Sequence, residues 1–183
     1  TCKKMNWPLD SYLKGDHPLQ IEVFRIISEL LEIKTSEINA ERDDCGAPTL
    51  YLKLLEMAKL YSLLSSSENA ELEQISRAMT TNPIMISDNN KFDTEIIKAS
   101  HGQVIGKGGA EGIQCLCKVN EGIGLALKVE DGSKRAKHAV SLQLLKQLEW
   151  ISDLRIQDIE EKVFNFSDGV RIEVKGQLKF QES

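Results

Sequence analysis

The residue pattern of the chain changes near residue 100, and this change limits the folds that it can adopt. Before that point, apolar residues recur at intervals of three and four, as on one face of a helix. After it come three short segments of alternating or apolar residues, separated by turns that contain glycine. Helices followed by a strand meander are typical of an α+β fold, with helices packed on an antiparallel sheet.

The expected elements fill most of the 183 residues. Helical spacing predicts helices over about 19–33, 49–64, 70–80, 92–100 and 134–150, with a short helical piece after 150. Alternation predicts strands over 102–107, 112–119 and 122–129, and a last strand at about 170–174. We expect Asp16 to cap the first helix, with Pro18 near its first position. The length suits a single domain over residues 1–183.

Composition and charge argue against several classes of protein. Charged residues make up 28% of the chain and the formal net charge is -5, so we expect no nucleic-acid partner. The densest basic cluster, residues 134–138, is interpreted as a solvated helix face. No apolar run approaches the roughly 20 residues that cross a bilayer, and we see no signal peptide. The four cysteines are therefore expected to be reduced thiols in a cytoplasmic protein: Cys2, Cys45, Cys115 and Cys117.

The stretch from Gly106 to Gly112 is the most informative candidate site. Lys107 stands at an expected strand end and is followed by Gly108 and Gly109. Glycines there let an ammonium group and the backbone approach a ligand closely. They are equally suited to a plain hairpin turn, which composition alone favours.

A second candidate is Cys45, in the polar loop before the helix expected from Thr49. A helix N-terminus favours thiolate, which is the form that binds zinc. A single cysteine in a turn is more often a small buried residue, and no second ligand is in view. The three histidines show no metal-ligand spacing with one another or with a cysteine.

Two further stretches favour structural roles. The charged end of 127–132 can bind substrate, but a strand-to-helix turn capped by Asp131 or Ser133 is the favoured interpretation. Ser11 and Lys14 form a Ser-x-x-Lys, the spacing that places a lysine one helical turn from a nucleophilic serine. The residues that follow would end any helix, so we interpret this match as chance.

A series of motifs, taken in order, resembles the bacterial asparaginase II protein family, the thermolabile rhizobial type. The motifs cover nearly the whole chain, and their joint order is more specific than any one of them. They are Trp7-Pro8, Asp16-His17-Pro18-Leu19-Gln20, Asp44-Cys45-Gly46-Ala47-Pro48-Thr49, Phe92-Asp93-Thr94, Lys107-Gly108-Gly109-Ala110-Glu111-Gly112, the stretch 124–132 and Arg135-Ala136.

The resemblance implies a fold like that of serine β-lactamases and glutaminases, and hydrolysis of L-asparagine to L-aspartate and ammonia. It implies acylation of a serine with a lysine as base, followed by hydrolysis of the acyl-enzyme. Lys107 would then be catalytic or orient the substrate carboxylate, Gly108 and Gly109 would line the substrate site, and Glu111 would receive the α-amino group. Cys45 matches one ligand of a zinc site in the family.

The chain also departs from the family pattern. It opens at Thr1-Cys2 without an initiator methionine, and the Cys-Ser-Gly-Lys-His box and the serine–lysine boxes of the family are absent. We therefore expect a C-terminal portion, with the N-terminal part missing, that does not turn over asparagine alone. Homodimerisation through an uncovered sheet edge is a further expectation. The alternative is a non-catalytic remnant acting as a structural or interaction module.

Overall fold

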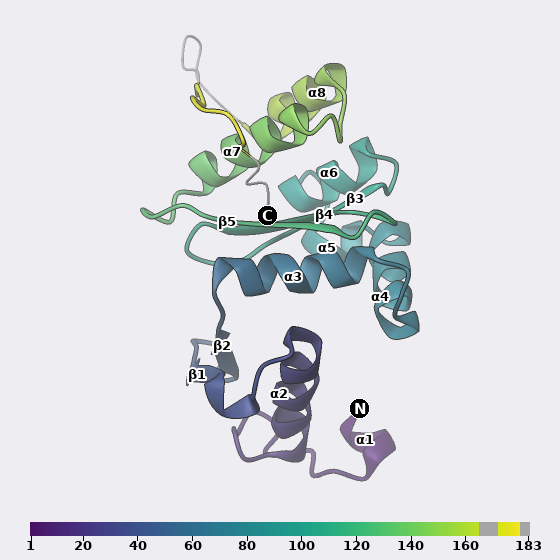
Figure 1. The fold of residues 1–183 in the computed structure, drawn as a ribbon, viewed down its shortest axis with the longest axis vertical. Coiled ribbons are helices and arrows are strands. Elements are labelled where there is room, and N and C mark those ends of the chain that lie inside the picture. The colour runs from purple at the N-terminus through teal and green to yellow at the C-terminus, as the bar shows by residue number, and fades with distance from the viewer. Residues whose placement is uncertain (165–171, 180–183) are drawn as a thin grey trace. The chain divides into compact units, whose positions relative to one another are not determined.

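The chain forms two compact units, Thr1–Glu56 and Met57–Ser183. The computed structural model describes residues 1–164 and 172–179. Figure 1 shows the order of the elements, coloured along the chain. The single domain predicted over residues 1–183 stays a prediction.

The first unit contains one long helix and a small hairpin. Its elements are α1 (Cys2–Met5), α2 (Pro18–Leu31), the 3-10 turn η1 (Thr35–Glu37), β1 (Asn39–Arg42) and β2 (Pro48–Tyr51). The two strands pair antiparallel, with Ala40 opposite Leu50.

His17 caps the start of α2, and the prediction of Asp16 as the cap was wrong. The Leu19 N–H donates to Nδ1 of His17 at 3.0 Å, which satisfies one of the free amides of the first turn. Nε2 of the same ring lies 3.0 Å from the Pro8 carbonyl oxygen, and the side chain is buried. Pro18 occupies the first helical position, as expected.

The helix predicted over 49–64 begins later than expected. Residues 48–51 form β2, and the helix, α3, spans Leu54–Ser65. The Glu56 carboxylate accepts the Lys53 N–H at 2.7 Å, which marks the start of the helical turn. A short apolar run does not distinguish strand from helix, and here pairing with residues 39–42 decides the outcome.

The sheet of the second unit is an antiparallel meander in the order β3-β4-β5, which confirms the prediction. Its strands are β3 (Val104–Gly108), β4 (Ile113–Lys118) and β5 (Ile123–Lys128). The described helices of this unit after α3 are α4 (Ala70–Thr81), α5 (Ile84–Ser87), α6 (Phe92–Ala99), α7 (Lys134–Gln147) and α8 (Asp153–Val163). Of these, α5 was not predicted.

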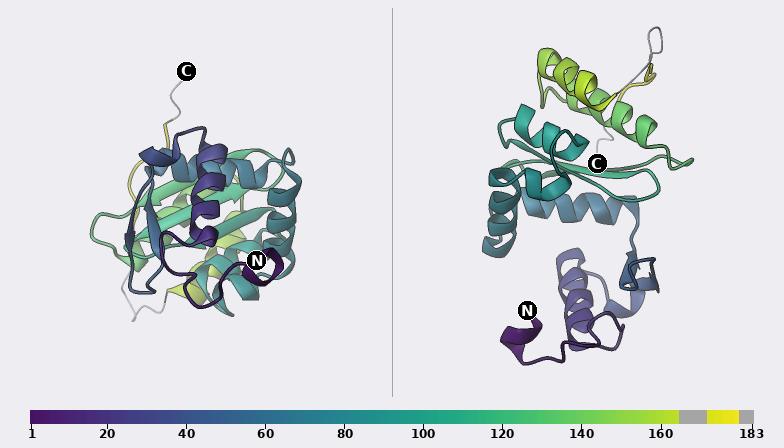
Figure 2. Two further views of the ribbon diagram at one scale, coloured as in Figure 1. Left: turned by 90° about the horizontal axis from the view of Figure 1, so that it is seen from below. Right: turned by 180° about the vertical axis from the view of Figure 1, so that it is seen from behind.

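Helices cover both faces of this sheet. One face carries α3, and the other carries α6 and α7, with α8 packed against these two helices (Figure 1); the view from behind agrees (Figure 2). A Cβ on Gly124 of β5 would lie 2.1 Å from the Ala58 carbonyl oxygen and 2.3 Å from the Ser62 nitrogen. Glycine is therefore what lets α3 rest directly on the strand. The apolar core fills the opposite face and includes Phe92, Ile96, Val104, Leu116, Leu142, Leu145, Ile156 and Ile159.

The two edges of the sheet differ. Side chains at the two ends of α6 cover the edge at β3: Asp93, in its first turn, accepts the Gly108 N–H, and the hydroxyl of Ser100, which follows the helix, accepts the Val104 N–H at 3.0 Å. Within the described residues no strand pairs with the outer edge of β5. The strand predicted at 170–174 lies partly outside the described residues, and residues 172–174 are not in a strand. The α+β class is confirmed, and a β-lactamase-like fold stays a prediction.

Candidate active site

The Lys107-Gly108-Gly109 segment ends β3 and enters the hairpin that leads to β4. The Gly109 N–H donates to the Ile113 carbonyl at 2.9 Å, and the Ile113 N–H donates to the Ala110 carbonyl at 3.2 Å. The glycines are thus hairpin residues, as composition alone favoured. Lys107 is exposed at the strand end.

A buried carboxylate lies under this segment, and sequence reasoning did not find it. Asp93, in the first turn of α6, accepts the Gly108 N–H at 2.9 Å through Oδ2. Its Oδ1 accepts from Nε2 of Gln114 in β4 at 2.8 Å. The side-chain oxygen Oε1 of Gln114 is buried without a hydrogen-bond partner. Asp93 and Gln114 lie 21 residues apart in sequence, so no local pattern joins them.

A buried ammonium group meets the same segment from α7. Nζ of Lys137 donates to the Gly109 carbonyl oxygen at 3.3 Å, although the residue is only 4% exposed. The solvated face predicted for residues 134–138 was therefore wrong for Lys137. Burial lowers the pKa of Lys137; the Asp93 carboxylate opposes the shift, and the ammonium groups of Lys107 and Lys134 add to it.

The Gly108 backbone closes directly over this ammonium group. A Cβ at Gly108 would lie 2.7 Å from Nζ of Lys137 and 3.1 Å from Oε1 of Gln114. Such distances are shorter than real Cβ contacts, so a side chain at this position would displace the buried groups. The buried side chains of Lys137 and Gln114 therefore require glycine at position 108.

The protein already uses the backbone polar groups of the two glycines. The N–H groups of Gly108 and Gly109 donate to Asp93 and Ile113, and the Gly109 carbonyl accepts from Lys137. The Gly108 carbonyl accepts from Nζ of Lys107. The Lys107 ammonium group, after it leaves this carbonyl, and the exposed side chain of Glu111 in the following turn remain available to a ligand.

Glu111 lies in the turn after the glycines, with a left-handed φ of 52° and an exposed side chain. A Cβ on Gly132 would lie 3.2 Å from Oε2 of Glu111, so this carboxylate reaches the turn before α7. In that turn the Ser133 side chain accepts the Ala136 N–H at 3.3 Å. The capping interpretation of Ser133 is thus confirmed.

Cys115 is the register partner of Lys107 in the β3–β4 pair. Its side chain therefore lies on the face of the sheet turned away from Asp93 and Lys137. Burial raises the pKa of Cys115 to about 11, and the Lys107 ammonium group opposes this shift. Burial raises the pKa of Cys117, on the same face, to about 12. Burial, followed by nearby Cys115, also raises the pKa of Tyr61. These groups are protonated at neutral pH and make no nucleophile there.

Cys45 lies in the turn between β1 and β2 and is exposed. Its N–H donates to Oδ1 of Asp43 at 2.9 Å, and a strand follows it. Activation by a helix N-terminus, which the sequence suggested, was therefore wrong. Nowhere in residues 1–164 and 172–179 do three or more His, Cys, Asp or Glu side chains gather as metal ligands. Cys45 is one ligand where zinc needs three or four, so these residues do not fit a zinc site.

Ser11 and Lys14 lie in a turn and not in a helix. The Lys14 N–H donates to the Ser11 carbonyl oxygen at 2.9 Å. The geometry in which a helical lysine faces a nucleophilic serine is therefore not formed, in agreement with the interpretation of this motif as chance.

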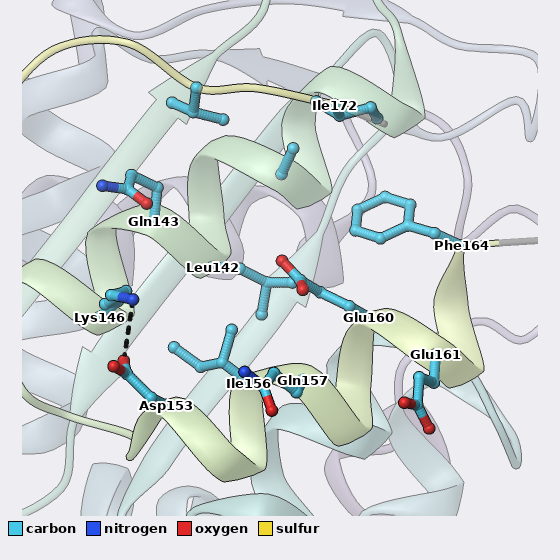
Figure 3. A pocket seen from close by; sticks show the side chains of 12 residues that line it. Leu142, Gln143, Lys146, Asp153, Ile156, Gln157, Glu160, Glu161, Phe164 and Ile172 are labelled. Atoms are coloured by element: carbon cyan, nitrogen blue, oxygen red, sulfur yellow. Dashed lines mark ion pairs between the residues drawn. The ribbon is translucent and has the colours of Figure 1, made fainter. Parts of the chain in front are cut away.

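A groove of about 530 Å³ lies between α7, α8 and residues 172–174 (Figure 3). An ion pair between Lys146 and Asp153, 3.2 Å long, crosses one end of it. It contains none of the site residues that the sequence predicts. Its lining mixes apolar and charged side chains, among them Leu142, Gln143, Ile156, Gln157, Glu160, Glu161 and Phe164.

Comparison with known proteins adds one positive result. A protein-family model described as L-asparaginase II matches residues 1–180. A search of curated proteins found no match. In the described part of the chain, every helix is too short or too polar to cross a membrane.

Proposed function

The chain belongs to the L-asparaginase II family, and from this premise we propose that it serves the hydrolysis of L-asparagine to L-aspartate and ammonia. The observation that carries the proposal is the family match over residues 1–180. The geometry adds support, since an exposed ammonium group stands at the end of β3 beside a turn that carries an exposed carboxylate.

In this proposal Lys107 binds the carboxylate of the substrate. Its Nζ exchanges the Gly108 carbonyl for the ligand, and the charge-assisted bond is stronger than the neutral contact that it replaces. Glu111 receives the α-ammonium group. Gly108 and Gly109 contribute room for close approach and not N–H donors, because both amides are already bonded.

We expect binding without turnover by these 183 residues alone. Acyl transfer needs an activated nucleophile held beside a base. The one Ser-x-x-Lys of the chain, Ser11 to Lys14, lies in a turn. L-Asparagine is proposed over L-glutamine on family membership, and the two differ by one methylene, which a pocket distinguishes by only about 1–3 kcal/mol.

Calorimetric titration with L-aspartate tests the binding site. The variant Lys107→Met should weaken binding at least about tenfold, because it removes the charged partner of the carboxylate. Lys118→Met, at the far end of β4, is the matched control and should bind like the wild type. No binding by the wild type, or equal binding by Lys107→Met, would overturn the proposal.

Ammonia release from L-asparagine and L-glutamine tests turnover. Steady release of ammonia by the purified chain would refute the expectation that it only binds. Its dependence on Lys107 would then still be measured with Lys107→Met. A slow background equal to that of a heat-denatured sample is the expected result.

One observation favours the alternative, a non-catalytic interaction module. The Val129 N–H donates to the Gly112 carbonyl, and the antiparallel register then places the N–H groups of Gly124 and Ala126 on the outer edge of β5. An edge of this kind pairs with a strand of a second chain. Light scattering should then show a homodimer, and exchange at these two amides should slow as concentration rises. A monomer at all concentrations would exclude self-pairing.

A further inference from the structure

We propose that Asp93 and Lys137 are positioning residues that hold the Lys107-Gly108-Gly109 segment in one conformation. This inference rests on the function proposed above: the affinity of Lys107 for a carboxylate ligand depends on Asp93 and Lys137. Neither side chain contacts the ligand. Both act through the two glycines that follow Lys107.

The burial of both charges needs a reason other than stability. Asp93 is 6% exposed and Lys137 4% exposed, and removing charged groups from water costs free energy unless they are paired and hydrogen-bonded. Apolar residues often replace such buried groups with no loss of stability, or with a gain. The two come from different helices, α6 and α7, and bond to neighbouring glycines of one strand end.

The geometry at Asp93 suits a carboxylate. Both of its partners are donors, the Gly108 N–H and Nε2 of Gln114. An asparagine in its place offers one acceptor and one donor, so it keeps both partners only if the Gln114 amide turns over, which takes Nε2 away from the Cys115 carbonyl oxygen. If Gln114→Glu accompanies Asp93→Asn, the new amide can accept from Gly108 and donate to the new carboxylate. The double change exchanges the two groups and keeps the net charge.

The hydrogen bond between Asp93 and the Gly108 N–H also fixes the direction of the Lys107 side chain. Side chains alternate between the faces of a strand, so a fixed Gly108 backbone fixes the face to which Lys107 points. Lys137 secures the next residue through the Gly109 carbonyl. Lys107 thereby loses freedom before a ligand arrives, and pre-ordering of this kind strengthens binding.

Amide hydrogen exchange tests the hold without any ligand. Asp93→Asn should speed exchange of the Gly108 N–H at least about tenfold relative to core amides such as that of Leu116. Ser100→Ala is the matched control, since it removes the other hydrogen bond between α6 and the β3 edge and should leave Gly108 unchanged. The double variant Asp93→Asn with Gln114→Glu should restore slow exchange. Unchanged Gly108 exchange in Asp93→Ala, which has no side-chain acceptor, would overturn the proposed role of Asp93.

Titration with L-aspartate tests whether ligand binding depends on Asp93 and Lys137. Asp93→Asn and Lys137→Met should each raise Kd at least about fivefold, whereas Ser100→Ala and the double variant should stay within about twofold of the wild type. Lys137→Met leaves the buried Asp93 carboxylate without this neighbouring ammonium group, so its melting temperature should fall. Kd is therefore measured at a temperature at which every variant is folded, and recovery of binding in the double variant separates positioning from a structural role. Equal Kd values in the wild type, Asp93→Asn and Lys137→Met would refute the proposal that binding depends on these two residues.

The two proposals fail in different ways. If the wild-type chain does not bind L-aspartate, the proposed function fails and the ligand dependence fails with it. The exchange of Gly108 then still decides whether Asp93 holds the segment.

Discussion

The imidazole of His138 lies flat against the ring of Phe92, with ring centroids 4.0 Å apart and planes 9° from parallel. The stack joins α7 to the first residue of α6, on the core side of the sheet. Burial lowers the pKa of His138 to about 4; the Lys137 ammonium group adds to the shift, and the Asp93 carboxylate opposes it. The ring is therefore neutral in the folded chain at neutral pH.

The lowered pKa of His138 predicts a loss of stability in mild acid. The unfolded chain takes up the proton near pH 6.5 and the folded chain only near pH 4, so the free energy of unfolding falls as pH drops through this window. The loss should reach about 3 kcal/mol. Urea unfolding at pH 7 and pH 4.5 measures it. His138→Phe, which keeps an aromatic ring on Phe92 and cannot titrate, should show a smaller loss; an equal loss would refute the prediction.

The close approach of α3 to β5 predicts a strong effect of one methyl group. Gly124→Ala would place a Cβ 2.1 Å from the Ala58 carbonyl oxygen, so helix and strand must separate. We expect a loss of about 2–4 kcal/mol in the free energy of unfolding. Gly109→Ala meets its nearest atom, on Ile113, only at 3.4 Å and should cost about 1 kcal/mol or less. Equal losses in the two variants would exclude the close approach.

A buried carboxylate predicts that α8 depends on one lysine. Nζ of Lys162 in α8 lies 2.7 Å from Oε2 of Glu95, whose side chain is 4% exposed. Lys162→Met should cost about 1–2 kcal/mol, because the buried charge loses its nearest partner. Lys146→Met breaks the ion pair with Asp153, which is exposed on both sides, and should cost less than about 1 kcal/mol. Thermal unfolding of both variants gives the comparison, and a larger loss in Lys146→Met would contradict it.

The thiols should differ sharply in reactivity. Cys45 is exposed, whereas Cys115 and Cys117 are buried and have pKa values raised by that burial. A thiol reagent at pH 8 should modify Cys45 at once and the two buried thiols only in denaturant. Mass spectrometry of peptides identifies the sites. Cys45→Ser should abolish the most rapid phase, and rapid labelling of Cys115 would show that the sheet face under α3 is open.

Much of the second unit follows from local patterns in the sequence. Period-two alternation with glycines predicted all three strands of the meander, and helical spacing predicted α4, α6 and α7 to within a few residues. These elements are specified locally, because strand and helix periods and the residues of tight turns act over a few positions. The Ser133 cap belongs to the same class, since its partner lies three residues away. The glycine turn after Lys107 was predicted for the same reason, whereas the roles of Lys107, Gly108 and Gly109 toward a substrate stay predictions.

What local patterns did not predict depends on partners distant in sequence. The residues of β2 carry apolar spacing compatible with a helix, and pairing with residues 39–42 makes them a strand. Lys137 looks like one of several surface cations until α7 packs on the sheet and buries it against Gly109, 28 residues earlier. Asp93 meets Gly108 across 15 residues and Gln114 across 21.

The sequence by itself therefore determined the α+β class, the meander and the residues of the Lys107-Gly108-Gly109 segment. Only the tertiary structure decided which groups stand behind that segment, and that its backbone amides are already bonded. Periodicity reports the face on which a residue lies, whereas burial and hydrogen bonding depend on which elements pack together. Long-range packing alone brings a carboxylate of α6 and an ammonium group of α7 to the same two glycines.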